Sequence, residues 1–157
     1  MTLKTIRYGY VLRFLMDGWI ILSILSGCDD TDCTTTSTSD IIIAFYDQDS
    51  LYEKPVSFDI VTAMGTDSLF YDQDDISSTF ILPAFPATDS TVFLFQNHSG
   101  SIDTLVVGYK RSVQLISETC GFVQIYSELS ASTTFPDVDV VSNELDSNDD
   151  IDIKIFI

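Results

Sequence analysis

Two copies of one acidic motif stand at the ends of apolar runs. YDQDS at 46–50 and YDQDD at 71–75 place several aspartates on predicted loops. Loop carboxylates are the hard oxygen ligands that calcium prefers, but neither segment has the glycine and the distal glutamate of an EF-hand loop. Aspartate also stabilises ordinary turns through its own side chain, so a calcium site and acidic turns both remain open. The candidate ligands are Asp47, Asp49, Asp72, Asp74 and Asp75, and SNDDID at 147–152 is a weaker candidate.

The single histidine gives little support to catalysis. His98 precedes Ser99 in FQNHSG, but a nucleophile and a base must meet in space, and adjacency in sequence does not establish that geometry. No glycine-rich phosphate loop is present, and no pair of acids can be singled out for acid–base work. The pattern favours a histidine in a loop or turn, and we predict no catalytic residue. An enzyme would require His98 and acids gathered in one pocket.

The first cysteine, Cys28, follows a segment with the layout of a secretory signal. Three basic residues precede an apolar stretch that ends in small residues. Asp17 interrupts that stretch, and each remaining piece is shorter than the roughly 20 residues of a membrane-spanning helix. Residues 25–28, LSGC, resemble a bacterial lipobox, which predicts cleavage before Cys28 and lipidation of its thiol. The alternative is an unprocessed N-terminal helix with an incidental cysteine.

Two cysteines, Cys33 and Cys120, then remain for other chemistry. An exported compartment permits a disulfide between them. A metal-binding pair would need further ligands, and His98 is the only histidine. We therefore predict a structural bridge, which would stabilise the fold by roughly 4–5 kcal/mol in the chain-entropy account.

The chain is strongly acidic, with a net charge of −17. Cleavage after residue 27 would remove three bases and one acid and leave 4 bases and 23 acids, a net charge of −19. Such a field repels nucleic acid, which makes nucleic-acid binding an improbable function. Three of the acids, Asp29, Asp30 and Asp32, also resemble the export signal of surface lipoproteins in Bacteroidetes-type bacteria. A solvated acidic tether explains them equally well.

Four hydroxyl side chains match an O-glycan acceptor pattern of Bacteroidetes-type envelope proteins. In that pattern, aspartate precedes the hydroxyl residue and a small apolar residue or threonine follows it. A glycan is bulky and hydrophilic, so modified residues must face solvent. The candidate acceptors are Ser50, Ser68, Ser90 and Thr104.

The elements that would position these residues are predicted to be strands. A signal at 1–27 and a tether at 28–39, with TTTSTS at 34–39 as a flexible spacer, precede a domain at 40–157. Apolar runs of strand length alternate with turn signals through that domain, and no long helical stripe interrupts them. The expected strands are 41–46, 56–61, 68–71, 79–82, 91–95, 104–109, 122–129, 138–141 and 151–157.

The last of these runs, IDIKIFI, shows the strand period most clearly. Its four isoleucines point one way, while Asp152 and Lys154 point the other. We expect Ile157 to be paired and packed, so that truncation there is damaging.

The strand pattern predicts an all-β fold. The number and spacing of the strands favour a single two-layer antiparallel β-sandwich of immunoglobulin-like architecture. Its core should contain Phe45, Phe58, Phe93, Tyr109 and Phe122.

The chain as a whole resembles a family of small Bacteroidetes-type lipoproteins whose domain has no assigned function. The resemblance rests on the lipobox and its acids, on CTTTSTSDIIIAFYD, SIDTLVVGYKRS and CGF, and on the terminal IDIKIFI. Family members commonly have a histidine before the last strand. Asp150 and Ile151 stand there in this chain, so no role is carried over. Members are often encoded beside a small outer-membrane protein, which the resemblance implies as a partner.

These observations predict an outer-membrane lipoprotein on the periplasmic or cell-surface side. We expect a non-catalytic binding or assembly module without a cofactor. Its working surface would be an exposed aromatic patch or an unpaired sheet edge that accepts an outer-membrane protein or a glycan. The alternatives are a calcium-dependent structural or adhesion module and, with less support, a small envelope enzyme.

Overall fold

A computed structural model describes residues 33, 37–72 and 75–157 of the chain. These residues belong to one compact unit, Cys33–Ile157, and none of them lies in a helix. In this part of the chain there is accordingly no helix long and apolar enough to cross a membrane. The predicted signal, Cys28, the tether acids and Asp74 lie outside the described residues.

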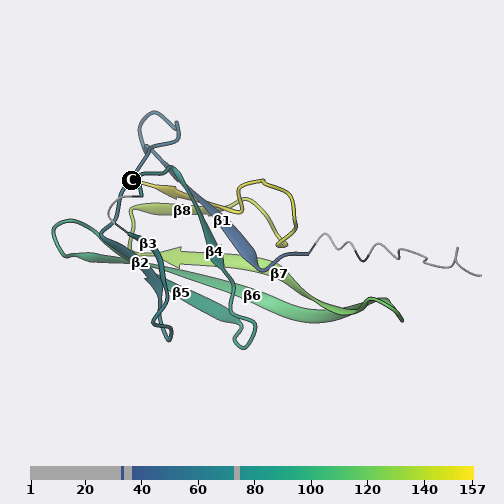
Figure 1. Ribbon diagram of the computed structural model, residues 1–157. Helices are drawn as coiled ribbons and strands as arrows, with labels where there is room; N and C mark the ends of the chain where they lie inside the picture. The colour runs from purple at the N-terminus through teal and green to yellow at the C-terminus, as the bar shows by residue number, and fades with distance from the viewer. Residues whose placement is uncertain (1–32, 34–36, 73–74) are drawn as a thin grey trace, which may run out of the picture. The chain divides into compact units, whose positions relative to one another are not determined.

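The described residues form two sheets, so the all-β, two-layer prediction is confirmed (Figure 1). One sheet has the strand order β4-β1-β9-β8, and the other has the order β3-β2-β5-β6-β7. The strands are β1 (Asp40–Tyr46), β2 (Ile60–Ala63), β3 (Leu69–Asp72), β4 (Thr79–Pro83), β5 (Ser90–Gln96), β6 (Ile102–Ser117), β7 (Gly121–Thr133), β8 (Asp137–Val140) and β9 (Ile153–Phe156).

One strand pair departs from the predicted antiparallel arrangement. β9 lies between β1 and β8 and runs parallel to β1, with Phe45 opposite Ile155. The alternating pattern of β9 shows which face is apolar, but it carries no information about the direction of a neighbouring strand. Ile157 donates its N–H to the carbonyl of Tyr46, and its side chain packs on the core, as expected.

The core between the sheets is built around Phe45. The ring centroid of Phe45 lies 5.5 Å from those of Phe58, Phe80 and Phe135. The contacts with Phe80 and Phe135 are edge-to-face, and such contacts add to the stabilisation that comes from apolar burial. Of the five predicted core aromatics, Phe45, Phe58, Phe93 and Tyr109 are buried. The prediction for Phe122 is wrong, because its side chain is 74% exposed.

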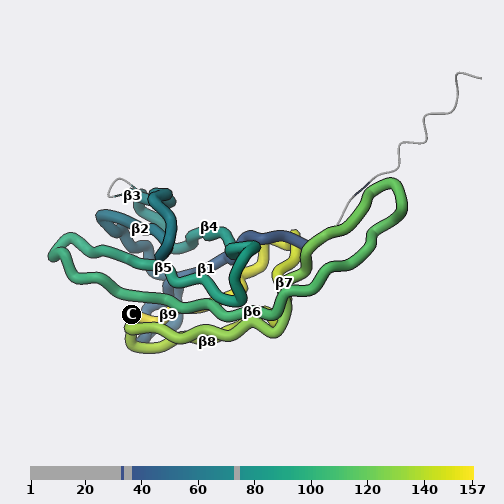
Figure 2. The backbone as a smooth tube through the Cα atoms, turned by 90° about the horizontal axis from the view of Figure 1, so that it is seen from below, coloured from purple at the N-terminus to yellow at the C-terminus, as the bar shows by residue number. Residues whose placement is uncertain are grey.

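The exposure of Phe122 follows from the length of the β6–β7 hairpin. β6 was expected to end at Tyr109 but continues to Ser117, paired with β7. β5 pairs with β6 only as far as Gly108, so the outer part of the hairpin has no strand beyond β6. Figures 1 and 2 show this part of the hairpin projecting past the two sheets.

The predicted flexible spacer is partly ordered against the domain. Ser37 donates its hydroxyl to the carbonyl of Gln124 at 2.8 Å and forms an isolated bridge with Asp146. Ser39 accepts a hydrogen bond from the backbone N–H of Ala84. Because of these hydrogen bonds, residues 37–39 belong to the folded unit and lead directly into β1.

Candidate functional site

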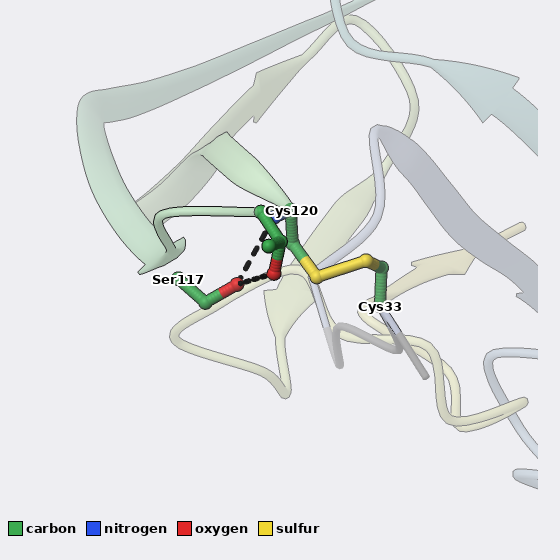
Figure 3. The surroundings of a disulfide bond; sticks show 4 residues. Cys33, Ser117 and Cys120 are labelled. Atoms are coloured by element: carbon green, nitrogen blue, oxygen red, sulfur yellow. Dashed lines mark hydrogen bonds between the residues drawn. A yellow bond between two sulfur atoms is a disulfide. The ribbon is translucent and has the colours of Figure 1, made fainter. Parts of the chain in front are cut away.

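The predicted disulfide is present and lies at the tip of the β6–β7 hairpin. Cys33 and Cys120 are bonded with a Cα–Cα distance of 5.5 Å, across a sequence separation of 87 (Figure 3). The backbone N–H of Cys120 donates to the Ser117 hydroxyl at 3.0 Å. Gly121 closes the turn at a φ of 76°, a conformation that glycine adopts without strain. The bond therefore fixes the start of the folded unit to the hairpin tip.

Apolar side chains are exposed beside this bond. Val113 is 69% exposed, Leu115 is 51% exposed and Phe122 is 74% exposed. Leu115 pairs with Phe122, and Val113 lies two residues before Leu115, so the three side chains share one face of the hairpin. We call these three residues the apolar tip.

The face that carries the apolar tip is the core-facing side of the hairpin. On β7 it continues through Gln124 to Tyr126, which is buried and packs edge-to-face on Tyr109 at 5.2 Å. The apolar tip therefore extends the core face past the point where the second sheet covers it. The apolar residues of VQLI at 113–116 are a sequence signal for the outer part of β6. The polar segment KRS at 110–112 separates them from the predicted strand at 104–109, so the continuation of β6 was not predicted.

The first acidic motif is a turn closed by Asp47. Its Oδ1 accepts hydrogen bonds from the backbone N–H of Asp49 at 3.2 Å and from the N–H and hydroxyl of Ser50 at 3.0 and 2.9 Å. The hydrogen bonds from Ser50 hold the pKa of Asp47 below its ordinary value, and the nearby Lys54 lowers it further by a smaller amount. This carboxylate therefore does what the acidic-turn interpretation predicts.

In the second acidic motif, hydrogen bonds connect Asp72, the last residue of β3, with Asp75. Asp75 accepts the N–H of Asp72 at 3.1 Å and donates its own N–H to the Asp72 carbonyl at 3.0 Å. Within residues 33, 37–72 and 75–157, no three acids, histidines or cysteines gather closely enough to hold a metal ion. Asp74 lies outside these residues, so the calcium site stays a prediction.

Other acids, Asp146, Asp150 and Asp152, line a pocket of about 370 Å³ beside β9. Asp152 directly precedes β9 and is only 7% exposed. Its Oδ2 accepts the backbone N–H of Ile42 at 2.8 Å, which explains why a carboxylate is tolerated there. Burial raises the pKa of Asp152, and Asp146 and Asp150, which also line the pocket, act in the same direction.

His98 lies in the β5–β6 turn, as predicted, but it has partners that the sequence did not reveal. Its Nε2 lies 2.9 Å from the Ser57 hydroxyl, and its Nδ1 contacts Oδ1 of Asp59. This is the order of groups in a Ser-His-Asp triad. The His98 side chain is 60% exposed, and water screens such contacts. Ser57 and Asp59 lie just before β2, and only the β2–β5 pairing brings them to His98.

The predicted O-glycan acceptors occupy two kinds of position. Ser50, Ser68 and Ser90 are exposed, as an acceptor must be. Thr104 is half-buried within β6, where its carbonyl accepts the Thr133 hydroxyl at 2.7 Å. Glycosylation remains a prediction for all four residues.

A comparison with protein families identifies the C-terminal part of the chain. Residues 59–157, more than half of the chain, match the sequence profile of a family of unknown function, DUF6452. The matched region begins just before β2 and includes both the β6–β7 hairpin and β9. No curated protein and no solved structure matches the chain.

Proposed function

The chain belongs to the family of unknown function DUF6452, and we propose that it is a lipid-anchored cell-envelope protein that acts as a non-catalytic binding or assembly module. The lipobox-like sequence at 25–28 supports the anchor, and the resemblance to Bacteroidetes-type lipoproteins supports the outer membrane as its location. The acid-rich segment after Cys28 is compatible with either side of that membrane.

The observation that carries this proposal is the Cys33–Cys120 disulfide. Disulfides persist in exported compartments and are rare in the cytosol. Cys33, one of the two bonded residues, is also the first residue of the folded unit. It lies five positions after the proposed lipidation site, Cys28. A domain held in this way close to its anchor suits a protein that presents a surface to envelope partners.

Edge strands offer the binding surface of such a module. β3 ends the five-stranded sheet and pairs with β2 on one side. β4 ends the other sheet, but there the Tyr71 hydroxyl already accepts the N–H of Ile81 at 3.0 Å. β3 is therefore a better candidate than β4 for pairing with a strand of an outer-membrane protein, and exposed aromatics such as Tyr52 offer a contact for a glycan.

Cell fractionation with protease treatment tests this proposal. We expect the wild-type protein in the membrane fraction and a Cys28→Ala variant in the soluble exported fraction. Digestion in intact cells would place the domain on the cell surface, and digestion only after lysis would place it in the periplasm. A wild-type protein that stays soluble and cytosolic would contradict the proposal.

A calcium-dependent structural or adhesion module is the alternative function. It has less support, because the Asp47 carboxylate already accepts hydrogen bonds from its own turn. A ligand that binds only the folded state raises the melting temperature. A melting temperature that rises with calcium, and not with magnesium, would favour this alternative.

A small envelope hydrolase is the third candidate, and the Ser57–His98–Asp59 contacts are the observation that favours it. A fluorophosphonate probe, which reacts with activated serines, separates it from the main proposal. We expect no labelling that depends on Ser57. Labelling that is lost in Ser57→Ala, but kept in the control Ser99→Ala, would favour the hydrolase.

A further inference from the structure

We propose that the apolar tip of the β6–β7 hairpin docks on the membrane that carries the lipid anchor. In this arrangement Val113, Leu115 and Phe122 enter the headgroup layer, and the domain takes one orientation on the bilayer. The inference rests on the proposed function, since it starts from a lipid at Cys28.

The disulfide limits how far the apolar tip can lie from the anchor. Cys33 lies five positions after Cys28, and an extended chain spans at most about 3.3–3.6 Å per residue. The Cys33–Cys120 Cα distance is 5.5 Å, and Phe122 follows two residues after Cys120. Phe122 is therefore within about 30 Å of the lipidated residue, however the tether is arranged.

The composition of the apolar tip suits a lipid interface. Scattered exposed apolar residues are normal on a protein surface. Here Leu115 and Phe122 form a cross-strand pair, and Val113 extends the same face. The hairpin end that carries this face projects past the two sheets, as Figure 2 shows. An aromatic and two aliphatic side chains at the end of a projecting element are typical of interfacial insertion.

The charge distribution also favours this end of the molecule. The chain has a net charge of −17, which opposes contact with anionic headgroups. Between positions 110 and 128, two bases, Lys110 and Arg111, balance two acids, Glu118 and Glu128. The hairpin therefore has no net charge of its own, so its side chains add no net repulsion between this acidic protein and anionic headgroups.

Tryptophan fluorescence in vesicles tests the inference. The only tryptophan of the chain, Trp19, lies in the proposed signal, so Phe122→Trp gives the processed protein a single tryptophan. The lipidated protein would be reconstituted in phosphatidylethanolamine–phosphatidylcholine vesicles, with its lipid verified by intact mass. We expect a blue-shifted emission, and quenching when the vesicles contain lipids brominated along their chains.

Tyr52→Trp is the matched control, because Tyr52 is an aromatic residue of similar exposure, 78%, in the loop after β1. We expect no quenching there. Co-flotation with vesicles without quenching at position 122 would overturn the inference while the anchor stands. A blue shift without quenching would overturn it in favour of contact with a second copy of the chain. A processed protein without lipid would overturn the proposed function, and the inference with it.

Discussion

Among the residues that the structure describes, Asp152 is the one buried carboxylate. Its oxygen accepts the N–H of Ile42, and desolvation raises its pKa. A raised pKa in the folded state means that the protonated form is favoured there. The contribution of this group to stability is therefore present below the unfolded pKa and is lost as pH rises through the folded pKa.

Asp152→Asn should remove the part of the pH dependence of stability that comes from Asp152, because asparagine keeps the acceptor oxygen and does not ionise. We expect the variant to gain stability relative to the wild type as pH rises towards neutral. Urea unfolding of both proteins over a pH series measures the difference. A stability difference that is constant with pH would contradict the account. Asp152→Ala, which leaves the Ile42 N–H without its acceptor, should cost about 1–3 kcal/mol.

Phe93 and Phe122 are aromatic residues of the same five-stranded sheet, but their environments are opposite. Phe93 is fully buried, and truncation of such a side chain to alanine costs about 3–5 kcal/mol. Phe122 is exposed, and surface substitutions usually stay within about 0.5 kcal/mol. Chemical denaturation of Phe93→Ala and Phe122→Ser should show this contrast. A large loss of stability in Phe122→Ser would mean that the apolar tip packs within the folded unit.

At the scale of elements, the disulfide stabilises the hairpin end of the fold. Cross-linking residues separated by 87 positions restricts the unfolded chain, and loss of a native bridge of this kind costs about 2–5 kcal/mol. Reductant should lower the urea midpoint of the wild type. A Cys33→Ser, Cys120→Ser double variant should match the reduced protein and should not respond to reductant. Equal midpoints for all four samples would contradict this role.

Most strand positions were predictable because half-buried strands alternate apolar and polar side chains, but the strand expected at 56–61 is found at Ile60–Ala63. Local pattern does not encode partners, which is why the parallel β1–β9 pairing was missed. The hairpin extension was missed because Lys110–Ser112 is polar, as a turn would be, while its hydrogen bonds come from β7. The aromatic character of Phe122 suggested burial, but no second sheet reaches it. The contacts of His98 with Ser57 and Asp59 depend on another long-range pairing, that of β2 with β5, which local sequence does not encode.

At the scale of the whole molecule, the net charge of −17 sets the response to salt. Like charges destabilise the compact state, and added salt screens them, with a Debye length of about 10 Å at 0.1 M and about 3 Å at 1 M. The melting temperature at neutral pH should therefore rise with sodium chloride. Chloride is preferable to sulfate, which stabilises proteins by exclusion from their surface. A melting temperature that falls with sodium chloride would contradict this prediction.

The lipid at Cys28 is the central claim, because both the envelope function and the membrane-docked hairpin depend on it. The most direct measurement is the mass of the N-terminal peptide of the protein isolated from membranes of its source. The account predicts that this peptide begins at Cys28 and carries a diacylglyceryl group. A peptide that spans residues 27 and 28 with an unmodified thiol would contradict it.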